Sequence, residues 1–157
     1  MITIKVPGKN ETIAIEHLVL DFNGTLALDG RLLPGVAELL RELAGHLQVH
    51  IVTAGTFGGV EKEIAAIPCV LKILAGENQT GQKGEYVALL GAERTACIGN
   101  GRNDSAMLGL ARLGIAVVQQ EGAAVESLLA ADVACCDIRH ALGLLLNPLR
   151  LTATLRT

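Results

Sequence analysis

Short apolar runs, separated by segments of helical pattern, determine the fold class of this chain. Four runs share this character: residues 18–20, 49–52, 95–98 and 114–118. They are mostly apolar without regular polar alternation, which is typical of strands buried on both faces. Between them, apolar residues return at helical spacing, as in residues 36–43. Buried strands that alternate with amphipathic helices predict an α/β domain with a largely parallel sheet in a three-layer, Rossmann-like arrangement.

The remaining elements follow from the same patterns. Helices are expected from Pro34 to Gly45 and around residues 60–64, 87–90, 107–111, 125–129 and 138–145, with further strands near residues 70–71 and 132–134. Residues 2–6 alternate with period two and residues 12–15 form a second strand, so residues 1–16 predict an N-terminal β-hairpin. Residues 148–157 form a C-terminal tail that either packs back on the domain or mediates oligomer contacts. We expect a single domain over residues 1–157.

Charge and cysteine content exclude several classes of protein. The net charge is −3 and the basic residues are scattered, so a nucleic-acid-binding surface is not expected. The four cysteines form no C-x-x-C pair and three lie in apolar runs, which argues against a disulfide scaffold and favours a reducing cytoplasm. No apolar run reaches the roughly 18 residues of a membrane span, and residues 1–6 lack the apolar region of a signal peptide. We expect a cytoplasmic protein without membrane partners.

Polar residues next to the predicted strand ends are the candidates for chemistry. Four segments qualify: residues 21–26, Thr53, Lys83 and residues 99–104. In open α/β sheets, ligands bind outside the carboxyl ends of the strands. Asp21 would stand at the mouth of the sheet, Gly24 would let backbone N–H groups turn toward an anion, and Lys83 would stand at an expected helix start, where a cation is unfavourable. Each segment alone also has an ordinary interpretation as a turn, strand end, solvated lysine or helix cap.

Taken in order, the four segments resemble the signature of the haloacid dehalogenase superfamily of phosphotransferases. That signature is D-x-[D/N/K/T]-G-T after the first core strand, a strand-terminal Thr or Ser, a Lys, and G-D-G-x-N-D before a helix. In this chain the corresponding segments are Asp21 to Thr25, Thr53, Lys83, and Gly99 to Asp104. The stretch from Lys83 to Val117 is similar to the phosphorylation domain of P-type ATPases, and especially to stand-alone soluble P-type ATPase-like proteins. The resemblance implies a HAD-like domain.

The resemblance also implies roles for individual residues. Asp21 would be the nucleophile that forms an aspartyl-phosphate, so the activity would be that of a Mg²⁺-dependent phosphohydrolase or phosphotransferase. The implied catalytic residues are Asp21, Asn23, Thr53 and Lys83. The implied phosphate-binding residues are Asn23, Gly24, Thr53 and Lys83, which would bind the transferring phosphoryl oxygens. The implied ligands of Mg²⁺ are Asp21, Asn23 through its backbone carbonyl, Asn100 and Asp104.

Two positions depart from the family pattern. Asn23 stands where most phosphatases of the family have an Asp that serves as general acid and base, a contribution worth roughly 10²–10⁴ in rate. Phosphomonoesters should then be poor substrates, whereas anhydrides and acyl phosphates, whose leaving groups need no proton, should suffer less. Asn100 stands where the family usually has a carboxylate ligand of Mg²⁺, so weak metal binding that improves with phosphate is expected.

The spacing of the motifs predicts that no cap domain covers the site. Residues 25–53 leave room for a flap turn and one helix, and residues 53–83 for one helix and one strand. The site should therefore be open to solvent unless a partner in a homo-oligomer covers it, which favours a macromolecular phosphorylated substrate or slow, unspecific turnover. Two alternatives to an enzyme remain: a weakly active or inactive regulatory domain that binds phosphate and Mg²⁺, and a receiver-like domain phosphorylated at Asp21 by a partner.

Overall fold

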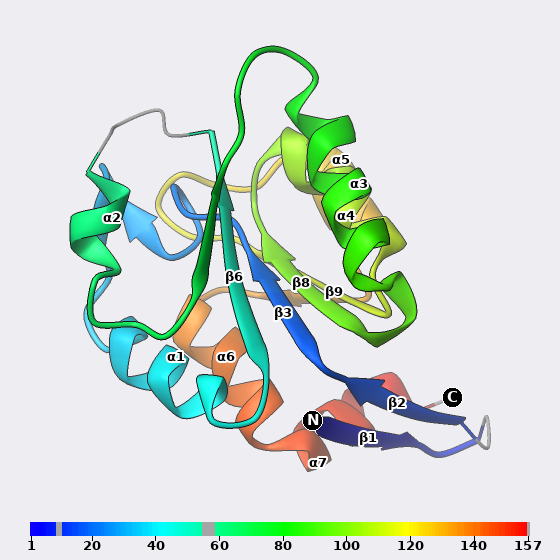
Figure 1. Cartoon of the computed structure of the whole chain (residues 1–157). Coiled ribbons are helices and arrows are strands. Elements are labelled where there is room, and N and C mark those ends of the chain that lie inside the picture. The colour runs from blue at the N-terminus through cyan, green and yellow to red at the C-terminus, as the bar shows by residue number, and fades with distance from the viewer. Residues whose placement is uncertain (9–10, 55–58, 157) are drawn as a thin grey trace.

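A six-stranded parallel sheet forms the centre of the computed structural model, which describes residues 1–8, 11–54 and 59–156 (Figure 1). Its strands lie in the order β10-β9-β8-β3-β6-β7. They comprise β3 (His17–Leu20), β6 (Gln48–Thr53), β7 (Val70–Ile73), β8 (Thr95–Gly99), β9 (Leu113–Val117) and β10 (Val133–Cys135). The predicted α/β class and parallel sheet are confirmed.

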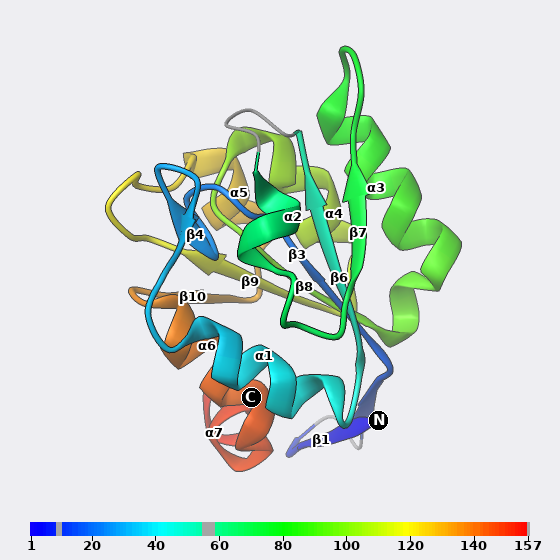
Figure 2. The same cartoon turned by 60° about the vertical axis from the view of Figure 1, so that its left-hand side comes forward.

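Helices cover both faces of this sheet. They comprise α1 (Val36–Ala44), α2 (Val60–Glu63), α3 (Gln79–Leu90), α4 (Ser105–Leu110), α5 (Val125–Ala130), α6 (Ile138–Leu146) and α7 (Pro148–Leu155), with short 3₁₀ helices at Ala92–Arg94 and Arg102–Asp104. The contacting helices α1 and α6 lie on one face, and α3, α4 and α5 pack together on the other (Figures 1 and 2). The arrangement is the expected three-layer one.

The central strands β3 and β6 are mostly apolar because both supply side chains to two separate hydrophobic clusters. Leu18 and Leu20 of β3 belong to the cluster under α1 and α6, whereas Val19 belongs to the cluster under α3 and α4. The same division separates Ile51 from Val52 in β6. Successive side chains of a strand point to opposite faces, so a strand covered on both faces is mostly apolar. His50 inside β6 is polar and buried, and its ring nitrogens are hydrogen-bonded to His17 and Tyr86.

The two ends of the chain form one small structure beyond the sheet. Strands β1 (Ile2–Val6) and β2 (Glu11–Ile15) pair antiparallel, which confirms the predicted hairpin, although Lys9 and Asn10 of the expected turn lie outside the described residues. Residues 148–155 of the expected tail form α7, which packs against β1 with Leu151 fully buried. The tail therefore packs back on the domain, and a role in oligomer contacts stays a prediction.

Only small insertions follow the first two core strands. Between β3 and α1, strands β4 (Ala27–Leu28) and β5 (Arg31–Leu32) form the expected flap turn. Between β6 and β7, the described residues contain the single short helix α2. In this described part of the chain, neither insertion builds a cap domain, as the spacing predicted.

Helix α3 begins earlier than the sequence suggested. Asn78 caps it by accepting a hydrogen bond from the backbone N–H of Gly81, and the helix starts at Gln79. Lys83 was expected at the helix start, but it lies in the second turn, where it shares the buried face with Val87 four residues later. The helix dipole therefore does not oppose the charge of Lys83 as expected, since the positive end of the helix lies one turn away.

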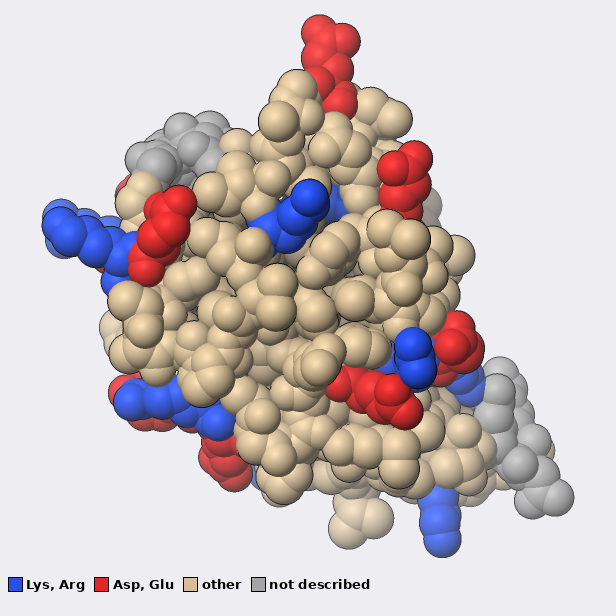
Figure 3. All heavy atoms as spheres, viewed as in Figure 1, with Lys and Arg blue, Asp and Glu red and all other residues tan. Residues whose placement is uncertain are grey.

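The structure also bears on membrane spans, disulfides and surface charge. Within the described residues, no helix is long and apolar enough to cross a membrane. All four cysteines are free, in agreement with the absence of a disulfide scaffold. On the face that Figure 3 shows, Lys and Arg side chains are scattered among acidic and uncharged ones. The cytoplasmic location stays a prediction.

Candidate active site

The site lies where the chain reverses its direction across the sheet. From the central strand β3 the chain continues to β6 and β7 on one side, and then returns to β8, β9 and β10 on the other. Such a switch point leaves a crevice outside the carboxyl ends of the two strands that flank it. Asp21 follows β3 and Asn100 follows β8, and the backbone N–H of Asp21 donates to Ile98 of β8 at 3.0 Å. The motif residues therefore meet at this crevice.

A lysine between two carboxylates forms the centre of the site. Lys83 Nζ lies 2.6 Å from Asp21 Oδ1 and 2.5 Å from Asp104 Oδ1. The Lys83 side chain is 0% exposed, so its charge is tolerable only because both carboxylates compensate it. The sequence interpretation of Lys83 as a solvated surface residue is excluded by this burial.

Burial and mutual proximity shift the titration of these groups. Burial raises the pKa of Asp21, the nearby Asp104 carboxylate raises it further, and the Lys83 ammonium opposes both, which leaves the pKa of Asp21 at about 7. Burial lowers the pKa of Lys83, but the two carboxylates more than offset that effect and raise it. Lys83 is therefore a permanent cation, while Asp21 gains or loses its proton near neutral pH.

Asp104 anchors the loop that follows β8. Its Oδ1 accepts from Lys83, and its Oδ2 accepts backbone N–H groups from Asn100 at 2.9 Å and Gly101 at 2.8 Å. The residue is fully buried. Both of its oxygens thus already have partners, and in this structure Asp104 positions Lys83 and the Asn100 backbone.

Thr25 connects the two strand-end loops through its hydroxyl group. Its Oγ1 lies 3.1 Å from Asn100 Oδ1 and 3.4 Å from Asp21 Oδ2, and the residue is fully buried. Thr25 belongs to the first motif, but no role of its own was predicted for it. In the structure its hydroxyl group links the loop that carries Asp21 to Asn100.

A small cavity of about 150 Å³ opens beside Asp21. It is lined by Asp21, Asn23, Thr53, Ala54, Gln79, Asn100, Gly101, Asn103 and Glu121. Of the residues predicted for the site, Asp21, Asn23, Thr53 and Asn100 line this cavity, while Lys83 and Asp104 stand in contact with Asp21 or behind it. The structure therefore brings the four motif segments to one place. Their individual roles stay predictions.

Oxygen atoms at the cavity fit a hard cation such as Mg²⁺. Asn23 Oδ1 is buried and has no hydrogen-bond partner in the described part of the chain, which is rare for a buried oxygen. Asp21 and Asn100 line the same cavity with a carboxylate and an amide. Among the described residues, no three His, Cys, Asp or Glu side chains converge as metal ligands. Amide oxygens and oxygens of the substrate would therefore have to complete a coordination shell.

No known family model matches the chain. A curated, uncharacterized protein from Methanocaldococcus jannaschii is 47% identical over 64 residues, which cover 41% of this chain and 69% of that protein. The two chains therefore belong to one family. The description of the archaeal protein assigns it no activity.

Solved structures are similar in fold over most of the chain. A protein of Legionella pneumophila, assigned to subfamily III A of the HAD superfamily hydrolases, matches with a TM-score of 0.66 and 20% identity over 90% of this chain and 87% of that chain. The 3-deoxy-D-manno-octulosonate 8-phosphate phosphatase of Moraxella catarrhalis matches with a TM-score of 0.66 and 15% identity over 88% of this chain and 90% of that chain. This chain has the haloacid dehalogenase fold. The fold expected from the ordered motifs is thus confirmed.

Gly24, in the first motif of this HAD-like domain, is required by its surroundings. Its φ of +78° lies in the left-handed region. A Cβ atom built on it would lie 2.4 Å from Asn100 Nδ2 and 2.8 Å from Glu121 Oε2. The loop after β3 therefore approaches Asn100 too closely for any side chain at position 24.

Gly24→Ala should lower the free energy of unfolding by about 1–3 kcal/mol through steric overlap, in addition to the strain of its positive φ. Gly76→Ala is a matched control, since Gly76 has a φ of +74° but nothing within 4 Å of the added atom. Urea unfolding of both variants measures the difference. Equal losses would mean that the Asn100 side chain yields and that the close approach is unimportant.

The HAD-like site includes a residue that the sequence interpretation missed. Glu121 lines the cavity from the turn after β9, and its Oε2 lies near both Gly24 and the Asn100 amide. A signal was available, because the polar residues at positions 119–121 directly follow a predicted strand, as Asp21 and Asn100 do. Judged alone, however, an exposed glutamate in a turn looks like an ordinary solvated residue.

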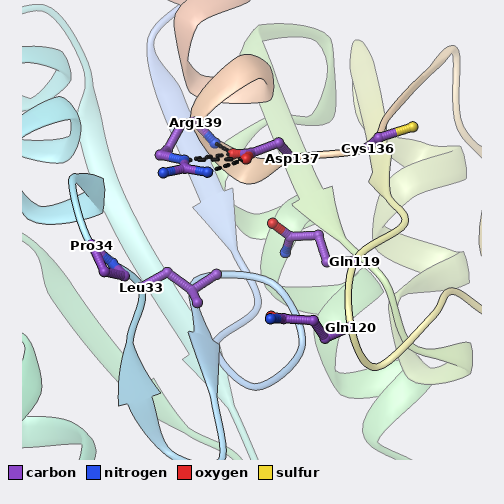
Figure 4. Close-up of a pocket in the computed structure, with 7 residues that line it drawn as sticks. All are labelled: Leu33, Pro34, Gln119, Gln120, Cys136, Asp137 and Arg139. Carbon is purple, nitrogen blue, oxygen red and sulfur yellow. Dashed lines mark hydrogen bonds and ion pairs between the residues drawn. The ribbon is translucent and has the colours of Figure 1, made fainter.

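A second hollow of about 590 Å³ lies on the other side of the same turn (Figure 4). It is lined by Leu33, Pro34, Gln119, Gln120, Cys136, Asp137 and Arg139. Its two charged side chains face each other, with Arg139 Nε 2.9 Å from Asp137 Oδ1, and hydrogen bonds from Arg139 hold the pKa of Asp137 at about 2. Arg139 is therefore engaged by its neighbour. The smaller cavity beside Asp21 and Lys83 is better suited to a phosphoryl group.

Proposed function

We propose that this chain is a Mg²⁺-dependent phosphohydrolase or phosphotransferase that acts through an aspartyl-phosphate on Asp21. The observation that carries the proposal is the pairing of Asp21 with the buried Lys83 cation at 2.6 Å, at the edge of an oxygen-lined cavity. A phosphoryl group that enters this cavity meets a carboxylate nucleophile next to a fixed positive charge.

Each side chain of the site has a separate role in the proposed reaction. An Asp21 oxygen attacks phosphorus, the bond from phosphorus to the leaving oxygen breaks, and water or an acceptor hydroxyl later removes the phosphoryl group from Asp21. Lys83 offsets the negative charge on the phosphoryl oxygens, and Thr53, which lines the cavity from the end of β6, binds them. Asp104 holds Lys83 in place from behind.

Support for a divalent metal comes from the donor set and from one structural neighbour. The Moraxella phosphatase is in complex with a magnesium ion, a phosphate ion and KDO. In this chain, Asp21, the backbone carbonyl of Asn23 and the side chain of Asn100 would hold the ion at the cavity, while Asp104 orients the Asn100 loop. A bound Mg²⁺ would supply positive charge to the phosphoryl oxygens.

Asn23 limits the proposed range of substrates. An amide cannot protonate a leaving alkoxide, so we expect anhydrides or acyl phosphates to be better substrates than alkyl phosphomonoesters. The described insertions leave the cavity without a cap, which supports a macromolecular phosphorylated substrate, or a second copy of the chain as the cover.

A weakly active regulatory domain that binds phosphate and metal is the second candidate. The observation that favours it is the presence of amides at both Asn23 and Asn100, since each removes a charge or a proton donor from the cavity. In that case, ligand binding at Asp21 would be retained while turnover is very slow.

Trapping with Mg²⁺ and beryllium fluoride tests the proposed site directly, because beryllofluoride mimics a phosphoryl group on aspartate. We expect stoichiometric, Mg²⁺-dependent binding to the wild-type protein, and none to Asp21→Ala. Isothermal titration calorimetry or fluorine NMR measures it. Asp132→Ala, which removes a carboxylate outside the cavity, is the control and should bind normally. Absence of binding to the wild-type protein at high Mg²⁺ would refute the proposal.

A further inference from the structure

The predicted metal site lacks negative charge. Asp21 and Asp104 bring two carboxylates, but Lys83 between them cancels one charge. Asp104 has both oxygens engaged, by Lys83 and by two backbone N–H groups. Asn100 contributes an oxygen without charge. A divalent cation is usually held by one or two carboxylates in addition to substrate phosphate, so another carboxylate near the cavity would matter.

Among the residues that line the cavity, Glu121 supplies such a carboxylate. Its Oε2 and the two polar atoms of the Asn100 amide all lie within 2.8 Å of one point, the position of a Cβ on Gly24. Glu121 is exposed, and its carboxylate has no hydrogen-bond or ion-pair partner in the part of the chain that the structure describes. The group is therefore charged, unpaired and directed toward Asn100.

The turn that carries Glu121 is fixed to both loops of the site. Gln119 Nε2 donates to the carbonyl groups of Gly24 at 3.2 Å and Thr25 at 2.9 Å. Asn100 Nδ2 donates to the carbonyl of Gly122 at 3.1 Å, and the Gly122 N–H closes the turn onto Gln119 at 2.8 Å. The Gln119 side chain thus binds the loop after β3, and the Gly122 carbonyl binds the Asn100 side chain. These hydrogen bonds therefore fix the backbone of Glu121 beside the cavity.

We propose that Glu121 supplies the carboxylate that Asn100 lacks, and that it holds the divalent cation of this site directly or through one of its coordinated waters. The inference rests on the proposed function in that the cation is the one required for phosphoryl transfer. Mg²⁺ usually keeps several waters in protein sites, so a carboxylate at the cavity rim can contribute through them. The exposed side chain avoids the desolvation cost that a buried third carboxylate would carry.

The position of Glu121 favours this role over replacement of the general acid. Its Oε2 lies close to Gly24 and to the amide of Asn100, which is an expected metal ligand. The general acid and base of the family belongs at position 23, and Asn23 occupies it. A metal role and an acid role also predict different responses to substitution.

Binding of Mn²⁺ alone, measured by electron paramagnetic resonance and by calorimetry, tests the inference without requiring catalysis. Substitution of Glu121 by Gln should weaken Mn²⁺ binding about 10- to 100-fold, as loss of a supporting metal ligand typically does. Glu42→Gln removes the same charge from an exposed site on α1 and should leave the affinity unchanged. Competition with Mg²⁺ then gives the same ratio for the physiological ion. Thermal unfolding without metal should be equal for all three proteins.

Each result of the Mn²⁺-binding experiment either supports or overturns the inference. A selective loss in Glu121→Gln supports the inference, even if beryllofluoride trapping fails and the proposed reaction has to be abandoned. Equal Mn²⁺ affinity in Glu121→Gln and wild type overturns it, as does a wild-type protein that binds no Mn²⁺. A changed pH dependence of turnover with unchanged metal affinity would also overturn it, since that result assigns Glu121 to proton transfer.

Discussion

Replacement of Lys83 by methionine is expected to lower the free energy of unfolding by about 3–5 kcal/mol at pH 8, because it leaves two neighbouring carboxylates buried without their cation. Both Asp21 and Asp104 depend on the same Nζ atom, at 2.6 and 2.5 Å. Urea unfolding in metal-free buffer measures the loss. Lys72→Met, at an exposed position of β7, should change stability by no more than about 0.5 kcal/mol.

The loss in free energy of unfolding caused by Lys83→Met should depend on pH. In the wild-type protein the pKa of Asp21 is raised from 3.8 to about 7, so the folded state binds the proton more tightly and stability falls as pH rises through this range. Removal of the Lys83 cation raises that pKa further. The loss of stability should therefore be largest above pH 7 and smallest near pH 4, where a proton neutralises Asp21. A deficit independent of pH would show that lost packing, and not lost charge, destabilises the variant.

Asn23→Asp is expected to raise the rate of alkyl phosphomonoester hydrolysis by roughly 10²–10⁴, because it restores a general acid beside the leaving group. The buried Asn23 Oδ1 has no partner among the described residues, so the position is available for a proton-carrying oxygen. The rate with acetyl phosphate should change much less, since its leaving group needs no proton. Steady-state kinetics with both substrates measures this difference.

Asn103→Asp is the matched control for that experiment. Asn103 lines the same cavity but is engaged with Gln79, at 3.0 Å from Nδ2 to Oε1. Its replacement adds an equal charge at another place. Similar gains in both variants would indicate a general effect of charge on metal binding. No gain in either variant would favour the regulatory domain over the enzyme.

The sequence predicted the fold and the convergence of the motifs because both depend on local patterns. A strand buried on both faces shows an apolar run, as at Leu18 to Leu20, and a polar residue directly after it marks the carboxyl edge of the sheet. The ordered motifs then indicated which strand ends meet. That Asp21, Thr53, Lys83 and Asn100 gather at one place follows from the topology of a parallel sheet.

What the sequence did not predict depends on contacts between distant segments. Glu121 is an ordinary turn residue until β9 pairs with β8 and brings the turn beside Asn100. Lys83 seemed to stand at a helix start because the preceding residues, which include Gly81, have weak helix propensity, yet the cap at Asn78 extends the helix. The alternation in residues 2–6 marks an apolar face on β1, but no local pattern reveals that the tail at 148–155 covers it as a helix.

The pairing of the central strand has a consequence for the way the site arises during synthesis. Strand β3 emerges early, but its neighbour β8 comes much later, and Lys83 follows Asp21 by 62 residues. Such long-range pairing folds slowly compared with local contacts. During synthesis, the loop that carries Asp21 therefore waits, without its cation and without its neighbouring strand, until Lys83 and β8 have also been made. Asp21, Lys83 and Asn100 therefore cannot come together before the segments on both sides of β3 are present.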